Sequence, residues 1–322
     1  MTRSSPHSPY DAIERACSER DEVIAALCIG LTWTTCRTAH NVGFAMSPGT
    51  PTRTLSWPGE IAGRAAAEVA TWVRSWDLYE ATVGLAAANA LINTPGNALM
   101  QSAEPVPPGS SANLSVFEYF RPQLNGRKVV VVGRYPGLDN ATRGLDVTVL
   151  ERNPSGNDLA DPAAEFVLPD ADWVFLTSTS LINKTFPRLA SLAENAVTVM
   201  MGPSTPWLTD WADFGVDFIA GVRPVDTDRA VQIAAEGGGT RLFGDGVQYA
   251  VADIGAERMT ATKARIAETF ARRDALKAEM LAWYDAGNQK RFPKRGELEA
   301  VDVTLSELDT RYKRQWDARN PH

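Results

Sequence analysis

The chain has 322 residues, of which 44% are hydrophobic and 22% are charged, and it contains 24 glycines and 20 prolines. This composition excludes a mainly disordered, collagen-like or coiled-coil protein, and the length suggests two domains with a small additional module. No apolar run approaches the roughly 18 residues that a membrane-spanning helix needs, and the first twenty residues lack the apolar core of a signal peptide. Three cysteines are too few for a disulfide framework. We therefore expect a cytoplasmic protein without a membrane partner.

Acidic and basic residues are distributed unevenly along the chain. Residues 256–322 contain 14 lysines or arginines and 11 acidic residues, a net charge of +3, while the whole chain carries −7. Residues 1–255 therefore carry a net charge of −10. Nucleic-acid binding needs a basic face that replaces the counterions of the phosphates, so this acidic body predicts no nucleic-acid partner.

Residues 1–105 have the pattern of a smaller α+β domain that ends in a linker. Asp77 followed by Glu80 has the form of a capping box, which begins a helix. The predicted elements are, in chain order, a helix at 11–18, β-like segments at 23–35 and 40–45, a helix with Ile61, Ala65, Val69 and Trp72 on one face, the helix after Asp77, and a proline-rich linker at 101–111.

Residues 106–252 alternate between strand and helix patterns. Short, continuous apolar runs are typical of strands that are buried on both faces, as in a parallel sheet covered by helices. The segment is therefore predicted to be a Rossmann-like α/β domain. Strands are predicted at 128–132, 147–151, 173–177, 197–201 and 217–220, and helices at 185–194, 206–214 and 227–236.

Residues 253–322 are predicted to form a helical extension. Seven apolar side chains between residues 259 and 284 fall on one side of a helix over 256–285, and a second helix is predicted near 304–317. This apolar stripe must be buried against the body or against a second subunit, so we expect a homo-oligomer.

Polar residues follow the predicted parallel strands, where ligands bind in doubly wound sheets. Lys184 and Asn183, in the loop after the third strand, are predicted catalytic residues. Asn89 lies on one helix face with Asn93, and that face either covers the ligand or holds neighbouring loops. The residues predicted to bind a ligand are Gly133, Arg134, Tyr135, Pro136, Glu151, Asn153, Thr179, Thr185, Gly202, Ser204, Thr205, Trp33, Thr34 and Asn89.

Glu151 occupies the place where nucleotide-binding folds put the acid that holds a ribose. The alternative is a carboxylate that caps its own loop. The first loop reads GRYPG and lacks the pattern G-x-G-x-x-G, which disfavours ordinary dinucleotide binding.

The sequence predicts no metal-ion site. Cys28, Cys36 and His40 do not have the spacing of zinc ligands, and the cysteines lie in apolar segments, where they are expected to be small buried hydrophobes. A Ser–His–Asp triad is also not predicted, because His40 is the only histidine outside the two ends of the chain.

The same loops resemble a family labelled putative heavy-metal chelation proteins. The matching stretches are 84–93 (GLAAANALIN), 129–136 (VVVVGRYP), 149–154 (VLERNP), 168–185 (LPDADWVFLTSTSLINKT), 201–206 (MGPSTP) and 216–222 (VDFIAGV). The resemblance covers about residues 20–250. It implies an enolase amino-terminal-like domain joined to a Rossmann-like domain, a cleft between them and a link to metal chelates.

The leading hypothesis is a protein that binds or processes, in a biosynthetic step for example, a small anionic metal-chelating metabolite or its metal complex. Any transition metal would then arrive as a chelate, held through its anionic oxygens by Lys184, Arg134 and the hydroxyl loops. Two alternatives stay open: a nucleotide- or S-adenosylmethionine-dependent enzyme that uses Glu151, and a non-catalytic scaffold that acts through its helical tail. The residues leave binding and catalysis equally open.

Overall fold

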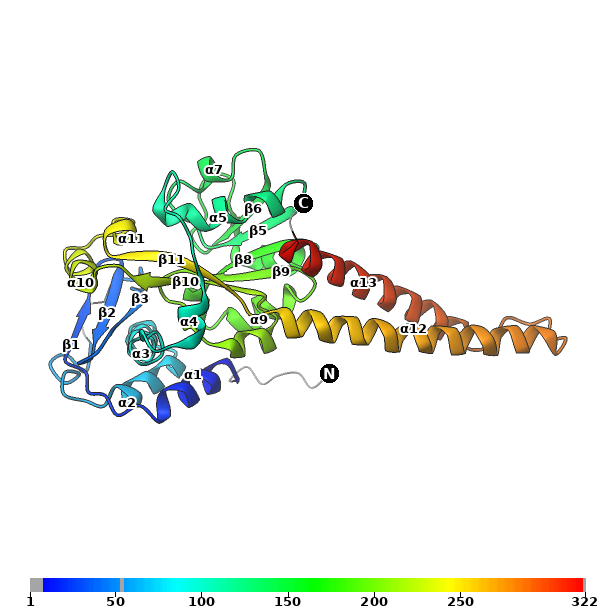
Figure 1. Ribbon diagram of the computed structural model, residues 1–322, viewed down its shortest axis with the longest axis horizontal. Helices are drawn as coiled ribbons and strands as arrows, with labels where there is room; N and C mark the ends of the chain where they lie inside the picture. Colours follow the sequence, from blue (N-terminus) through cyan, green and yellow to red (C-terminus); the bar gives the residue numbers. More distant parts are fainter. Residues whose placement is uncertain (1–7, 53–54, 321–322) are drawn as a thin grey trace.

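The computed structural model describes residues 8–52 and 55–320. The first unit contains a three-stranded antiparallel sheet with the order β1-β2-β3 and helices packed on it (Figure 1). Its elements are α1 (Ser8–Ser18), β1 (Ala26–Ile29), β2 (Trp33–Arg37), β3 (Val42–Met46), α2 (Ala66–Ala70), the 3₁₀ helix η1 (Thr71–Arg74) and α3 (Leu78–Ile92). This α+β arrangement confirms the prediction, while the likeness to the enolase amino-terminal domain stays a prediction. The helix predicted to carry Ile61, Ala65, Val69 and Trp72 is wrong in part: α2 begins only at Ala66, because Ala65 is paired with Val23 in an isolated β-bridge, and Trp72 lies in η1.

Helix α3 begins where the capping pattern predicts. The Asp77 carboxylate accepts hydrogen bonds from the backbone N–H groups of Tyr79 and Glu80. Glu80 does not complete the box, because its carboxylate accepts a hydrogen bond from the Ser75 hydroxyl instead. Every residue of α3 from Ala81 to Ile92 is buried, so this helix is the centre of the first unit.

The second unit is built on one large sheet with helices on both faces. In the described part of the chain eight strands have the order β4-β11-β10-β9-β8-β5-β6-β7, and all neighbours from β10 to β7 are parallel. Its elements before β8 are α4 (Ala98–Ser102), β4 (Glu104–Pro105), η2 (Ala112–Leu114), α5 (Ser115–Tyr119), α6 (Arg121–Leu124), β5 (Lys128–Val132), α7 (Leu138–Ala141), β6 (Asp146–Glu151), β7 (Leu159–Ala160), η3 (Asp161–Ala163) and α8 (Ala164–Val167). The later elements are β8 (Trp173–Thr177), η4 (Ser178–Leu181), α9 (Phe186–Leu192), β9 (Val197–Met201), η5 (Thr209–Phe214), β10 (Phe218–Pro224), α10 (Thr227–Ala235), α11 (Leu242–Asp245) and β11 (Val247–Asp253).

The predicted Rossmann-like sheet is confirmed, but three local predictions are wrong. The stretch 101–111 is not only a linker, because β4 within it pairs with β11 at the edge of the sheet. The helix predicted at 206–214 is a 3₁₀ helix that begins at Thr209. Strand β11 was not predicted, although it runs antiparallel to β10 over seven residue pairs.

The two units share their hydrophobic cores. One face of the large sheet, including Val174 and Ile219, packs in a single cluster with α1 and α3 of the first unit. The opposite face packs against α5 and also against Trp33 and Phe44 from the small sheet. Because both clusters cross from one unit to the other, the small sheet is held in place over one end of the large one.

The predicted helical extension is an antiparallel hairpin of α12 (Ala256–Asp285) and α13 (Arg295–Arg319), which projects far from the sheets (Figure 1). Leu276 packs against Leu298 and Val301 between the two helices. Phe270 and Tyr284, on the same helix, remain 48% and 43% exposed. The apolar stripe is thus only partly covered within the chain, and self-association stays a prediction. None of the helices in residues 8–52 and 55–320 combines the length and apolarity needed to cross a bilayer.

Candidate functional site

The chain order of the large sheet reverses between β5 and β8. Strands β6 and β7 follow β5 on one side, whereas β8, β9 and β10 extend in the other direction. In such sheets the loops after the two central strands diverge and leave a crevice at the carboxyl ends, where ligands bind. Val132, Leu176 and Met200 are aligned across β5, β8 and β9, so the three loops that follow these strands begin side by side.

Gly133 begins the first of these loops in a conformation that favours glycine. Its φ is +96°, and a Cβ at this position would lie 3.2 Å from Cγ2 of Thr177 at the end of β8. The loop therefore passes directly over the next strand. A larger residue would be strained and would push the loop away from the carboxyl ends.

Strand β3 of the first unit meets the loops after β8 and β9. The backbone N–H of Met46 donates to the Ser204 hydroxyl at 2.8 Å, and the Thr179 hydroxyl lies 3.6 Å from the Met46 sulfur. The Thr205 hydroxyl donates to that of Ser178 at 2.9 Å. The structure thus brings Thr179, Ser204 and Thr205 together with the first unit, and both Ser204 and Thr205 are buried there.

Asn89 and Asn93 hold the loop after β9. The Asn89 amide donates to the carbonyls of Phe44 and Ser204, and the Asn93 amide donates to that of Thr205. The Asn93 side-chain oxygen accepts from the backbone N–H of Trp207. Of the two interpretations, these contacts favour the one in which this helix face fixes neighbouring loops. The Asn89 side-chain oxygen is buried without a hydrogen-bond partner among the described residues.

Trp33 and Thr34 are the first two residues of β2 in the small sheet. The Trp33 indole N–H donates to the carbonyl of Gly239 at 2.9 Å, and its ring meets that of Phe243 edge-on. The Thr34 hydroxyl pairs with that of Ser47 at 2.9 Å. Both predicted residues are thus engaged with their own surroundings.

Glu151 caps its own loop and also holds the loop after β5. Its two carboxylate oxygens accept the backbone N–H groups of Arg134 and Asn153, at 2.8 Å and 3.1 Å. The Arg134 guanidinium is paired with Asp139 at 2.8 Å and with the buried side chain of Asp158 at 3.4 Å. The predicted positive charge of Arg134 is therefore largely offset, and these contacts favour the capping interpretation of Glu151.

Lys184 connects the loop after β8 with the first unit. Its ammonium donates to the carbonyls of Val73 at 2.6 Å, Ile182 at 3.1 Å and Leu181 at 3.5 Å, and it lies 5.0 Å from the centre of the Tyr10 ring. Lys184 has a left-handed backbone with φ of +67°. Its three donors all face backbone carbonyls, so the structure gives this lysine a bracing role, and its catalytic role stays a prediction.

Asn183 is occupied within the same loop. Its side-chain oxygen accepts both the backbone N–H of Thr185, at 3.1 Å, and the Thr185 hydroxyl, at 2.6 Å. Asn183 and Thr185 thus bond to each other directly before α9. Their roles in catalysis and binding stay predictions.

Burial lowers the pKa of Lys184 to about 8, which predicts a pH dependence of stability. Between pH 8 and about 10.5, the ordinary pKa, the folded protein loses this proton before the unfolded chain does, so stability rises with pH. Urea unfolding at pH 7.5 and 9.5 should show the free energy of unfolding of the wild type rising by about 1–2 kcal/mol relative to Lys184→Met. The exposed Lys294, whose pKa Glu279 raises, is the control, because the difference in free energy of unfolding between the wild type and Lys294→Met should be the same at both pH values. A constant difference for Lys184→Met would contradict the prediction.

Two tyrosines near the carboxyl ends of the parallel strands have buried hydroxyls. Neither hydroxyl has a hydrogen-bond partner in the described part of the chain. One is the predicted Tyr135, and the other is Tyr249 on β11. Burial raises the pKa of both phenols. Tyr249 was missed because β11 was not recognised, although its alternating sequence VQYAVAD is typical of a strand.

The two buried thiols are poorly suited to bind metal ions. Burial raises the pKa of Cys17 and of Cys36 to about 12, so both stay protonated at neutral pH. A metal ligand must be the thiolate. Among residues 8–52 and 55–320, no group of three or more His, Cys, Asp or Glu side chains is placed to hold a metal ion.

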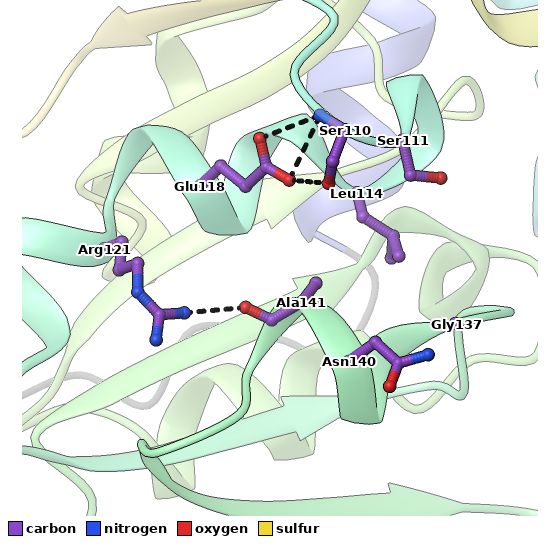
Figure 2. A pocket seen from close by; sticks show the side chains of 8 residues that line it. All are labelled: Ser110, Ser111, Leu114, Glu118, Arg121, Gly137, Asn140 and Ala141. Atoms are coloured by element: carbon purple, nitrogen blue, oxygen red, sulfur yellow. Dashed lines mark hydrogen bonds between the residues drawn. The ribbon is translucent and has the colours of Figure 1, made fainter.

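A surface pocket of about 600 Å³ lies beside the first loop. Figure 2 shows that its charged side chains are already engaged: Glu118 accepts from Ser110, and Arg121 donates to the carbonyl of Ala141. Gly137 at the end of the GRYPG stretch also lines it. This pocket therefore presents little free polar chemistry.

Comparison with known proteins identifies relatives of both units. A family model described as "Putative heavy-metal chelation" matches residues 115–253, and another with the same description matches residues 10–92. An uncharacterized protein of Methanocaldococcus jannaschii is 27% identical over 190 residues, which are 52% of this chain. The match spans 64% of that relative's length.

Two crystal structures of proteins with unknown function, from the same family as the match to residues 115–253, are similar in fold. The one from Desulfitobacterium hafniense has a TM-score of 0.67 and 28% identity, and covers 79% of this chain and 100% of its own. The one from Pyrococcus horikoshii has a TM-score of 0.63 at 19% identity, with 76% and 99% covered, and indicates the fold alone. With both units matched in order and solved family members sharing its fold, the chain belongs to the family described as "Putative heavy-metal chelation".

Proposed function

We propose that this protein binds a small anionic chelator, free or with its metal, at the carboxyl ends of β5, β8 and β9 beneath β3. The observation that carries the proposal is the meeting of hydroxyl groups from the large sheet with β3 of the first unit. Thr179 and Ser204 both contact Met46 there. The sheet holds these loops in fixed positions. Their hydroxyl groups can therefore donate hydrogen bonds to ligand oxygens without large rearrangement.

The chemistry of these groups suits a chelate better than a free ion. Hydroxyl groups donate hydrogen bonds to carboxylate oxygens, whereas a soft metal ion prefers thiolate or imidazole ligands. The buried thiols of Cys17 and Cys36 stay protonated and so would not compete with a chelator for its metal. In this proposal the metal is cargo and remains coordinated by the chelator.

Isothermal titration calorimetry at pH 7.5 tests the proposal with citrate and nitrilotriacetate, each alone and as its Ni²⁺ complex, and with NiCl₂ alone. We expect at least one chelator or complex to bind and NiCl₂ alone to bind more weakly. Thr179→Val, which keeps the side-chain shape and removes the hydroxyl, should weaken binding about 10-fold, because a hydrogen bond to a charged group is lost.

The matched control is Thr260→Val on the hairpin, where the hydroxyl bonds only to the carbonyl of Ala256 within its own helix. Its affinity should equal that of the wild type. Tight binding of NiCl₂ without binding of any chelator would refute the proposal. Binding of NADH, ATP or S-adenosylmethionine that is lost in Glu151→Gln would favour the nucleotide alternative instead.

A further inference from the structure

We infer that the hydroxyls of Tyr135 and Tyr249 together bind one anionic oxygen of the ligand, such as a carboxylate oxygen. This inference rests on the proposed function and assigns the inner end of the same site. Neither hydroxyl has a hydrogen-bond partner among the described residues, although both are buried. A buried polar group without a partner costs stability, and two of them within electrostatic range of each other call for a common explanation.

The strand register places both tyrosines at the same level beyond the sheet. Val132 of β5 is aligned through β8, β9 and β10 with Ala252 of β11. Tyr135 comes three residues after Val132, and Tyr249 comes three residues before Ala252 on an antiparallel strand. Both residues therefore lie just past the level at which β8 and β9 end, with three strands between β5 and β11.

The two phenol groups lie within electrostatic range of each other. Tyr135 contributes, after burial, to the raised pKa of Tyr249. The Thr177 side chain lies near that of Tyr135 and opposes the rise of its pKa, but the geometry between the two falls short of a hydrogen bond. Thr177 at the end of β8 thus lies next to Tyr135.

Aromatic neighbours hold each tyrosine in place. The Tyr249 ring stacks on Phe243 with centroids 5.0 Å apart, and Phe243 in turn meets Trp33. The Tyr135 ring meets Phe117 edge-on at 5.7 Å. Tyr249 is 1% exposed. The phenols are therefore held by packing, and a ligand would meet donors that are already oriented.

The protonation state of the pair sets the class of ligand. Because burial raises the pKa of both phenols, they are neutral at physiological pH and each offers one O–H donor. Two neutral donors that reach the same ligand oxygen stabilise its negative charge, as in an oxyanion hole. The expected ligand group is a carboxylate or a similar anionic oxygen, and the rest of the molecule would extend toward Thr179 and Ser204.

Single Tyr→Phe variants test the inference through two independent measurements. Without ligand, Tyr249→Phe and Tyr135→Phe should have a melting temperature equal to or above that of the wild type, because each removes an unpaired buried hydroxyl. Tyr10→Phe is the reference variant, because the Tyr10 hydroxyl does have a partner and donates to the carbonyl of Leu181 at 3.0 Å. Its melting temperature should be lower than that of the wild type. If Tyr249→Phe melts as low as Tyr10→Phe, the hydroxyl has a structural partner such as a buried water, and the inference is overturned.

The second measurement is the affinity for citrate, nitrilotriacetate and benzoate, the last being a carboxylate that does not chelate metals strongly. Each of the two variants should bind about 10-fold more weakly than the wild type. Tyr119→Phe, which removes a hydroxyl that donates to Glu104 at 2.7 Å, should bind like the wild type.

The outcomes separate this inference from the proposed function. Chelators that bind the wild type and both variants equally would overturn the role of the tyrosines and leave the proposed function standing. Benzoate binding that depends on the tyrosines, without chelator binding, would support the tyrosine pair and refute chelate binding. If no carboxylate binds the wild type, both proposals are refuted.

Discussion

Gly43→Ala is expected to destabilise the protein by more than about 3 kcal/mol, at the upper end of the cost of overpacking a core. Gly43 lies on β3 directly against α3. A Cβ at this position would come 2.0 Å from the backbone oxygen of Ala86 and 2.2 Å from the backbone nitrogen of Ala90. Both atoms belong to the helix backbone, so the clash cannot be relieved by turning a side chain. Strand β3 and α3 would have to separate.

Urea unfolding followed by circular dichroism measures this loss. Gly49→Ala is the matched control, because a Cβ at Gly49 meets no described atom within 4 Å and its free energy of unfolding should change by less than about 1 kcal/mol. A displaced β3 would also move Met46 away from Ser204, so the Gly43→Ala variant should bind the chelator more weakly. Equal stabilities for the two variants would show that β3 and α3 do not pack this closely.

Asp217→Ala is expected to cost about 3–5 kcal/mol, the range for removing one partner of a buried ion pair. Asp217 is fully buried at the start of β10. Its carboxylate accepts from Arg258 of α12 at 2.7 Å and lies 3.6 Å from Arg319 of α13, and it also accepts the backbone N–H of Thr198 at 3.2 Å. Burial raises the pKa of Asp217, although both arginines oppose this shift. One carboxylate thus joins both helices of the hairpin to the sheet.

The variant should loosen the hairpin as well as lower stability. Hydrogen exchange of α12 and α13 near Arg258 and Arg319 is expected to speed up more than that of the central strands. The control is Asp228→Ala, which breaks the exposed pair with Arg37 at 2.6 Å and should cost less than about 1 kcal/mol. If Asp217→Ala costs no more than Asp228→Ala, the buried carboxylate does not anchor the hairpin.

The strands of the large sheet were predictable because their apolar runs are continuous. β5, with the sequence KVVVV, and β9, with VTVMM, are buried on nearly every residue, so their assignment did not depend on knowing the neighbouring strands. The hairpin was also visible, since helical periodicity is local. Its second helix begins earlier than predicted, at Arg295, and Leu298 and Val301 in its first turns pack against α12.

The error at 101–111 has its origin in pairing between segments that are distant in the chain. Glu104 and Pro105 form a strand only because β11 lies beside them. Strand β11 is in turn held in the sheet by its pairing with β10. Side-chain partners follow the same rule. The sequence shows a lysine at position 184, but the carbonyl of Val73 that accepts from it comes from another unit.

The amino-acid sequence by itself determined the order of the elements, the parallel sheet, the family and the loops that gather at its carboxyl ends. These follow from local periodicity and from short stretches such as GRYPG and STSLINKT, which are read without knowledge of distant contacts. Only the tertiary structure decided which polar groups already have a hydrogen-bond partner within the protein. Lys184, Asn183, Arg134 and Glu151 bond to protein groups, whereas the Tyr135 and Tyr249 hydroxyls have no partner among the described residues. A hydrogen bond depends on positions in space to within a fraction of an ångström, and residues far apart in the chain reach those positions only when the fold is complete.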